Sequence, residues 1–119
     1  MDDKKNILKD KSYDFSVRIV KLGLYLSKEY KEFVLSRQVV RSGTSIGANI
    51  EEAFQGESKS DFIHKLSIAN KEAFETNYWL RLLRDSGLIT ESQAEPVIAT
   101  CIELQKMLTA AIRTSKSRL

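Results

Sequence analysis

The residues of this chain that could do chemistry are a few carboxylates and a single histidine. Glu72 and Glu75 stand three positions apart, which places both on one side of a helix, as an acid and base pair for hydrolysis would require. No nucleophile, oxyanion donor set or glycine-rich phosphate loop accompanies them. We therefore interpret both as partners in salt bridges to Lys71, Arg81 or a neighbouring helix, and expect no catalytic residue and no enzymatic activity.

A metal centre is also not expected. A metal pair bridged by carboxylates in a helical bundle needs two Glu-x-x-His pairs and two further glutamates. This chain has one histidine, which stands in a lone Asp61-x-x-His64 pair. We expect no metal ligands and no cofactor, and interpret this pair as surface or capping chemistry.

Basic residues provide the remaining indication of a binding function. The formal net charge is +3, which permits an anionic partner without requiring one. Between Glu103 and the end of the sequence, four basic residues stand against one acid. The alternative interpretation is that these basic residues have no binding role. They would then belong to a solvated helix surface, where cations are favourable near a helix C-terminus. The candidate contacts to nucleic acid are Arg37, Arg41, Lys65, Lys71, Arg113, Lys116 and Arg118.

A stripe of polar residues follows one side of the segment that contains Arg41. Gln38, Ser42, Ser45, Asn49 and Glu52 lie within about a third of a turn at helical spacing, and only the last is charged. A hydrogen-bond network between helices that holds their register is one interpretation, and a purposeful polar site is the other. We assign five residues to this polar interface network: Ser45, Asn49, Glu52, Glu72 and Glu75.

Four helices are needed to position these side chains. Apolar spacing predicts a first helix over about residues 13–29 and a second over about 35–57. Ser60 is expected to cap a third helix that runs to Ser86, where Gly87 is the stop signal, and a fourth begins near residues 90–92. We expect residues 1–119 to form a single all-α domain, an antiparallel up-down-up-down bundle, with residues 1–11 a frayed leader and 115–119 a frayed tail.

Two glycines in the second predicted helix are expected to be packing residues. Gly43 and Gly47 are four apart, and each costs about 1 kcal/mol of helix propensity. Close approach of another helix backbone would offset that cost, because neither glycine has a side chain. We therefore expect both glycines to face a closely packed helix.

The third predicted helix is apolar on most of its circumference. Phe62, Leu66 and Leu80 form one face, while Phe74 and Trp79 point to opposite flanks. A helix of a monomeric bundle keeps an outer face in water, so this pattern predicts contact with neighbouring chains. The expected state is a homo-oligomer.

The sequence also indicates the cellular location of the protein. The single cysteine, Cys101, excludes an internal disulfide, and its place on an apolar helix face predicts a buried, inert thiol. The N-terminal residues resemble no signal peptide, and no run of 18 apolar residues could cross a membrane. We expect a cytoplasmic protein.

Residues in the second and third predicted helices carry a resemblance to a known family. The matching positions are Arg41, Ser45, Ile46, Asn49, Ile50 and Glu52, followed by Ala69, Glu72, Glu75, Tyr78, Trp79 and Leu80. They fit a pattern near R-x-(S/A)-x-S-I-x-x-N-I-A-E-G and a following A-x-x-E-x-x-E helix. The run resembles the bacterial 23S rRNA-intervening sequence proteins, and departs from them at Glu51 and Ala53, where the family more often has alanine and glycine.

The resemblance implies an antiparallel four-helix bundle assembled into a homopentameric barrel without known enzymatic activity. A related branch, the accessory variability determinant of diversity-generating retroelements, binds a reverse transcriptase and nucleic acid. Our leading hypothesis is accordingly a non-enzymatic oligomer that binds structured RNA or DNA, or a nucleic-acid enzyme such as a reverse transcriptase, through basic surfaces of a ring. The competing hypothesis is a protein-interaction scaffold that binds no nucleic acid.

Overall fold

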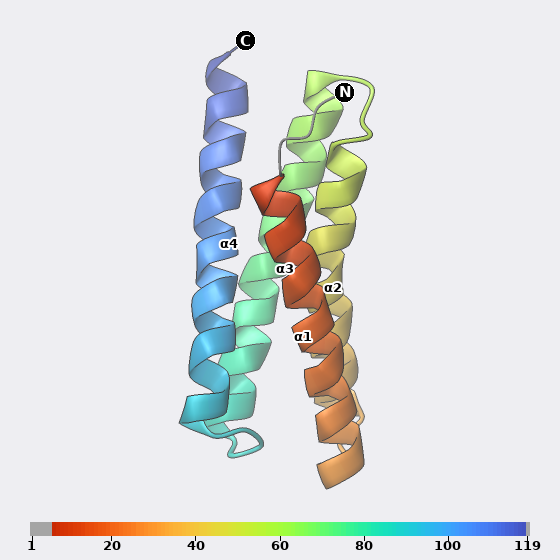
Figure 1. Ribbon diagram of the computed structural model, residues 1–119, viewed down its shortest axis with the longest axis vertical. Coiled ribbons are helices and arrows are strands. Elements are labelled where there is room, and N and C mark those ends of the chain that lie inside the picture. Colours follow the sequence, from red (N-terminus) through yellow and green to blue (C-terminus); the bar gives the residue numbers. More distant parts are fainter. Residues whose placement is uncertain (1–5, 119) are drawn as a thin grey trace.

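The computed structural model describes residues 6–118, which form four antiparallel helices (Figure 1). The helices are α1 (Ile7–Tyr30), α2 (Val34–Ala53), α3 (Lys59–Asp85) and α4 (Glu91–Ser117). No strand occurs among the described residues. The predicted all-α, four-helix architecture is therefore confirmed.

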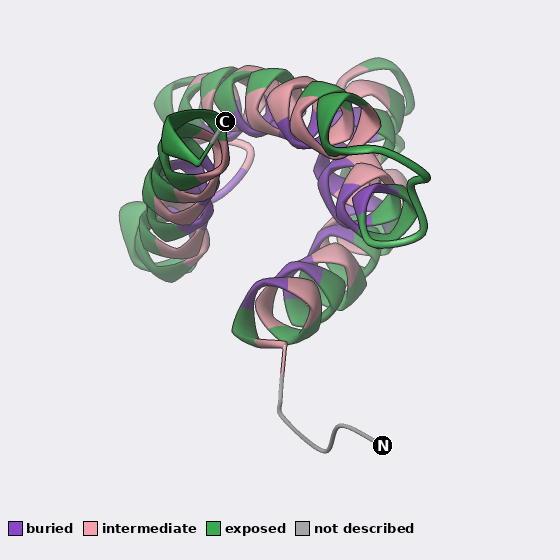
Figure 2. Ribbon diagram, turned by 90° about the horizontal axis from the view of Figure 1, so that it is seen from above, coloured by how far each residue is buried: buried purple, intermediate pink, exposed green. Residues whose placement is uncertain are grey.

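The helices pack mainly on their neighbours in the sequence. Contacts join α1 to α2, α2 to α3 and α3 to α4, while the contact between α1 and α4 is the smallest. Seen from above, the ribbons follow a horseshoe whose buried residues line the inner side (Figure 2). The Nζ of Lys11 lies 3.1 Å from the Oε1 of Glu103 and so joins α1 to α4 across the open side. The helices share one core, whose largest fully buried side chains include Phe15, Ile19, Leu26, Ile46, Ile50, Leu66, Leu80, Leu83, Leu104 and Leu108.

Both ends of the chain are more helical than the sequence suggested. The side chain of Asn6 accepts a hydrogen bond from the amide of Lys9, so α1 begins at Ile7 and residues 7–11 are not a frayed leader. At the other end α4 continues to Ser117, so residues 115–117 are not a frayed tail. The predicted fraying of residues 1–5 and 119 lies outside the described part of the chain.

The connections between helices differ from prediction by a few residues because several side chains could act as caps. Glu32 accepts hydrogen bonds from the amides of Val34, Leu35 and Ser36, at 2.9–3.2 Å, which starts α2. Helix α2 ends at Ala53 instead of residue 57. Ser58, not Ser60, caps α3 by accepting from the amide of Asp61.

The turn between α3 and α4 agrees better with the sequence. Gly87 has a φ of +80°, the left-handed conformation that the predicted helix stop requires. Thr90 and Gln93 then form a reciprocal capping box at the start of α4, with bonds of 3.1 and 2.8 Å.

Candidate functional site

The glycines of α2 lie against α1. A Cβ added to Gly43 would come within 2.7 Å of the Cγ2 of Ile19, a fully buried side chain. At Gly47 an added Cβ would lie 3.2 Å from the Oγ of Ser16 and 3.3 Å from the carbonyl oxygen of Ser12. The small-residue run of α2 thus brings the α1 and α2 backbones together, as the expected role of these glycines requires.

The polar stripe of α2 bonds mostly within its own helix. The Oγ of Ser45 donates to the carbonyl of Arg41 at 2.6 Å, and the side-chain amide of Asn49 donates to the carbonyl of Ser45 at 2.8 Å. Neither joins another helix, because the carbonyl one turn back is within reach of a short polar side chain. The stripe is joined to α3 by two other members. The buried hydroxyls of Ser42 and Thr76 lie 2.9 Å apart, and Glu52 accepts from Lys65.

Arg41 ties α2 to α3. Its guanidinium donates to Glu75 and lies 3.4 Å from an oxygen of Glu72, and Gln38 accepts from it at 3.2 Å. The indole of Trp79 donates to Glu75 at 2.9 Å. The two glutamates therefore act as the salt-bridge partners expected of them, and the same ion pairs engage Arg41, one of the proposed contacts to nucleic acid.

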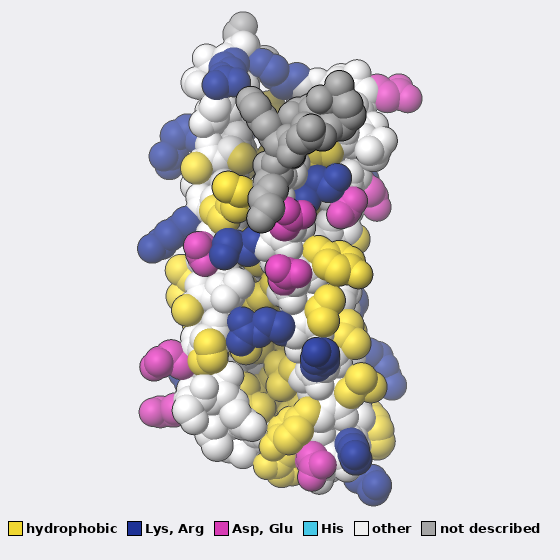
Figure 3. Space-filling model, in the orientation of Figure 1, with side chains coloured by type: hydrophobic (Ala, Val, Ile, Leu, Met, Phe, Trp, Pro, Cys, Tyr) yellow, Lys and Arg dark blue, Asp and Glu magenta, His cyan; other side chains and the backbone are white. Residues whose placement is uncertain are grey.

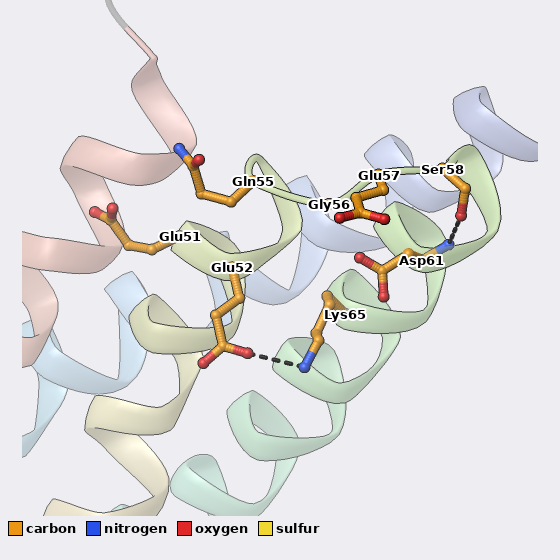
Figure 4. A pocket seen from close by; sticks show the side chains of 8 residues that line it. All are labelled: Glu51, Glu52, Gln55, Gly56, Glu57, Ser58, Asp61 and Lys65. Carbon is orange, nitrogen blue, oxygen red and sulfur yellow. Dashed lines mark hydrogen bonds and ion pairs between the residues drawn. The ribbon is translucent and has the colours of Figure 1, made fainter.

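Lys65 is also paired with a carboxylate. Its Nζ lies 2.8 Å from the Oε1 of Glu52, and this hydrogen bond raises the pKa of Lys65, with a further contribution from the charge of Glu52. The pair lies in an open pocket of about 620 Å³ between the end of α2 and the start of α3 (Figure 4).

Four carboxylates line the same pocket, those of Glu51, Glu52, Glu57 and Asp61, but they do not converge. Glu51 and Gln55 point away from Lys65, toward the α1 side, while Asp61 lies beside the Ser58 cap (Figure 4). Glu51 is 3.8 Å from the Nζ of Lys9. Within residues 6–118 no group of three potential ligands is arranged to hold a metal ion.

Three of the proposed nucleic-acid contacts gather on the last turns of α4. Arg113, Lys116 and Arg118 are exposed, and the Nζ of Lys59, at the start of α3, donates to the carbonyl of Arg118 at 3.0 Å. Residues 104–118 contain no carboxylate, and none of these three cations forms an ion pair among the described residues. We call Lys59, Arg113, Lys116 and Arg118 the α4 basic end; dark blue side chains gather along this upper α4 edge in Figure 3.

The other two proposed contacts lie apart from the α4 basic end. Arg37 is exposed on α2 near the opposite end of the bundle, and Lys71 is exposed on α3. The structure therefore divides the seven residues into three that gather, two that stand alone, and two, Arg41 and Lys65, that are paired with carboxylates. Spacing along the sequence could not distinguish these cases, because the carboxylates involved lie on another helix.

Helix α1 exposes an apolar surface that was not predicted from the sequence. Tyr13, Val17, Val20 and Leu24 follow the spacing i, i+4, i+7, i+11, and the first and last are 64% and 65% exposed. Hydrophobic side chains gather over α1 in Figure 3. The signal was present in the sequence, as a second apolar stripe beside the core stripe of Phe15, Ile19, Leu22 and Leu26.

Two hollows lie where this stripe meets α2. The Gly47 hollow, of about 280 Å³, is lined by Tyr13, Ser16, Thr44, Gly47, Ala48 and Glu51. The Gly23 hollow, of about 330 Å³, lies further along and is lined in part by Val20, Gly23, Leu24, Arg37 and Val40. Together they form what we call the α1–α2 groove.

Helices α3 and α4 also expose apolar side chains. Phe74 on α3 is 60% exposed, and beside it Ile102, Lys106 and Arg113 of α4 line the same shallow depression. Exposure of Phe74 agrees with the expectation that α3 has more apolar surface than one bundle buries.

Cys101 has no place in a reactive site. Its thiol is fully buried and donates to the carbonyl of Ala73 at 3.2 Å. Burial raises its pKa to about 12, which keeps it protonated at neutral pH.

No helix in the part of the chain that the structure describes is long and apolar enough to span a membrane.

Comparison with known proteins identifies the family. A crystal structure of a protein of unknown function from the S23 ribosomal protein family, from Bacteroides thetaiotaomicron VPI-5482, is 54% identical. It aligns over 88% of this chain and 97% of its own, with a TM-score of 0.87. No curated protein matches the sequence. The family model for the 23S rRNA-intervening sequence protein matches residues 4–110, and the chain therefore belongs to the 23S rRNA-intervening sequence protein family.

Proposed function

We propose that this protein is a non-enzymatic, self-associating four-helix bundle that binds structured nucleic acid through the α4 basic end. The observation that carries the proposal is the stretch from residue 104 to 118, which has four basic residues and no acid. Arg113, Lys116 and Arg118 project from consecutive turns at one end of the bundle, with Lys59 beside them. Phosphates bind such clusters without any particular base sequence.

Self-association strengthens this binding. Three or four cations on one protomer make few phosphate contacts, but copies arranged in a ring present the same cluster several times to one nucleic acid. The exposed apolar stripe of α1 and the exposed Phe74 support assembly, because a monomeric bundle would keep such surfaces in water. The resemblance described above implies five copies, and we adopt a homopentamer in the cytoplasm, where structured RNA is abundant, as part of the proposal.

The absence of enzymatic activity is also part of the proposal. It is supported by the arrangement of Glu72 and Glu75, since both carboxylates meet the guanidinium of Arg41 and one also accepts from Trp79. Carboxylates held in this way serve to join α2 to α3.

The test is a salt titration of binding to structured RNA and to duplex DNA, followed by fluorescence anisotropy. The variant is the triple charge reversal Arg113→Glu, Lys116→Glu, Arg118→Glu. Each lost phosphate contact should flatten the dependence of log K on log salt by about 0.7–0.9. The control reverses three cations of α1 instead, Arg18, Lys21 and Lys28, and makes the same change in net charge.

The expected result is weak binding by the α4 variant and near-normal binding by the α1 variant, when both keep the wild-type sedimentation. Equal losses in the two variants would show that net charge alone is responsible. Undetectable binding by the wild-type protein at low salt would refute the proposed function.

The exposed α1–α2 groove favours a second candidate, a scaffold that binds a protein such as a reverse transcriptase. Such a partner should remain bound after nuclease treatment and should be unaffected by the α4 charge reversals. A partner released by nuclease would favour nucleic-acid binding.

A further inference from the structure

We propose that Phe74 of one copy inserts into the Gly47 hollow of the next copy, with all copies pointing in the same direction. This inference rests on the self-association in the proposed function and assigns the two faces that meet. The partner of each surface is a second copy of this chain.

Phe74 has the exposure of an interface residue. It lies near the middle of α3 and is 60% exposed, with Ile102 and Lys106 of α4 beside it. A phenyl ring in this position is a large apolar group without a partner in its own protomer, and aromatic residues are enriched at protein interfaces.

The Gly47 hollow has the size and lining to accept that ring. Its volume is about 280 Å³, whereas a cavity of roughly 150 Å³ holds benzene. The hollow exists because Gly47 and Ala48 have little or no side chain where α2 passes α1, and Tyr13 forms one wall. A larger residue at either position would fill it.

Phe74 and the hollow lie at the same height on the bundle. The hydrogen bond between Ser42 and Thr76 sets these two residues side by side on α2 and α3. Because the helices are antiparallel, Thr44, two residues further along α2, is level with Phe74, two residues back along α3. Thr44 lines the Gly47 hollow. By the same register Gly47 is level with Lys71, about one turn from Phe74 toward the start of α3, which is the direction in which helical side chains lean. Contact between parallel copies therefore needs little shift along the long axis.

This geometry closes a ring. The two surfaces are different, so each copy uses Phe74 on one side and the hollow on the other, which is a heterologous contact. Heterologous contacts form helical filaments when each step includes a rise along the axis, and closed rings when the rotation closes without one. Parallel copies in contact at equal height fit the second case.

The charges beside these surfaces favour the parallel arrangement. The hydrogen bond of Cys101 to Ala73 sets the height of α4, and places Lys106 within about one residue of the height of Glu51 at the rim of the hollow. Glu95 lies on the same face of α4 as Lys106, and within about two residues of the height of Arg37.

Parallel copies would therefore bring Lys106 toward Glu51 and Glu95 toward Arg37. Antiparallel copies would instead bring Lys106 toward Arg37 and Glu95 toward Glu51, which places like charges together. Complementary charges of this kind determine orientation more than affinity.

The test measures the assembly of purified full-length protein by sedimentation velocity over a concentration series. Phe74→Asp removes the ring from an exposed position, and Ala48→Phe fills the hollow from an exposed position. The matched control is Val34→Asp, which removes a 67% exposed side chain at the first residue of α2, where a carboxylate suits the helix N-terminus. Circular dichroism and thermal unfolding establish that each variant folds.

We expect Phe74→Asp and Ala48→Phe each to raise the dissociation midpoint at least tenfold, while Val34→Asp leaves it unchanged. Mixing the two assembly-defective variants provides a stricter test, because Phe74→Asp retains a normal hollow and Ala48→Phe retains a normal ring. The mixture should form a heterodimer through its one intact interface.

The proposed ion pair between Lys106 and Glu51 is tested by exchanging the two charges. Glu51→Lys and Lys106→Glu should each weaken assembly at low salt, and the double variant should restore it. A wild-type protein that remains monomeric would overturn both the self-association and this inference. A wild-type oligomer whose Phe74→Asp and Ala48→Phe variants assemble normally would overturn only the assignment of faces.

Discussion

Replacing Gly43 with alanine should destabilise the protein even though alanine is the better helix former. The new Cβ would lie 2.7 Å from the Cγ2 and 2.9 Å from the Cγ1 of Ile19, well inside ordinary van der Waals contact, which begins at 3.4 Å. Ile19 is fully buried and branched at Cβ, so it has few other rotamers available. Overpacking of this kind costs about 1–3 kcal/mol, against a gain of about 1 kcal/mol in helix propensity.

The matched comparison is Gly47→Ala, in the same helix one turn further on. Its Cβ would lie 3.2 Å from the Oγ of Ser16, which can rotate away, and 3.3 Å from the carbonyl oxygen of Ser12. Both variants are made in the Phe74→Asp background, because Gly47 lines the hollow proposed to receive that ring. The gain in propensity is the same, so the difference between the two variants then measures the difference in steric cost. We expect Gly43→Ala to be about 1–2 kcal/mol less stable than Gly47→Ala.

The assay is urea unfolding at one fixed protomer concentration, because assembly adds to the apparent stability. A double-mutant cycle with Ile19→Ala then tests the cause, since that change removes both γ-carbons and should relieve the penalty at Gly43. Equal stability of the two glycine variants, or a penalty that persists beside Ile19→Ala, would refute the steric explanation.

Three further predictions concern caps, ion pairs and the thiol. Glu32→Ala should lower the free energy of unfolding by about 1–2 kcal/mol, since it removes the acceptor of three amide groups at the start of α2, whereas the exposed Glu29→Ala should not. The raised pKa of Lys65 means that its pair with Glu52 stabilises the fold fully below the ordinary lysine pKa of 10.5 and loses this effect as the pH rises through the higher folded value. The difference in the free energy of unfolding between wild type and Glu52→Gln should therefore be constant from pH 8 to about 10 and shrink as the pH rises above 10.5. Cys101, with a pKa of about 12, should react with a thiol reagent at pH 8 only when urea unfolds the protein, and fast labelling of the native state would contradict its burial.

The sequence predicted helix type and core faces well, because periodic apolar spacing is a local property. The helical spacing of Leu35, Val39, Gly43, Ile46, Ile50 and Ala53 predicts one face of α2. The last five of these are buried, and Leu35, in the first turn, is only half-buried. The cap of α3 is Ser58 and not the predicted Ser60, because both serines offer the same hydroxyl and only the fold shows which of them precedes the first helical turn.

The candidate site was harder to predict, for a physical reason. Whether Arg41 is free to bind phosphate depends on Glu72 and Glu75, more than thirty residues away, and on the register between α2 and α3 that brings them close. The α1 stripe shows the same limit. Two apolar stripes run side by side along α1, and spacing alone does not determine which of them the other helices cover.

The sparse contact between α1 and α4 has a consequence for how the chain folds. Each helix packs chiefly on the next one in the sequence, so most contacts are local and the contact order is low, a property of fast-folding proteins. The contacts between α1 and α2 need no residue of α3 or α4, so we expect them to form before the later helices have been synthesised. In the finished protein the two terminal helices each have one main neighbour, so their amide hydrogens should exchange with solvent before those of α2 and α3. The helix that bears the basic end is therefore made after the other three and is expected to be one of the first to open.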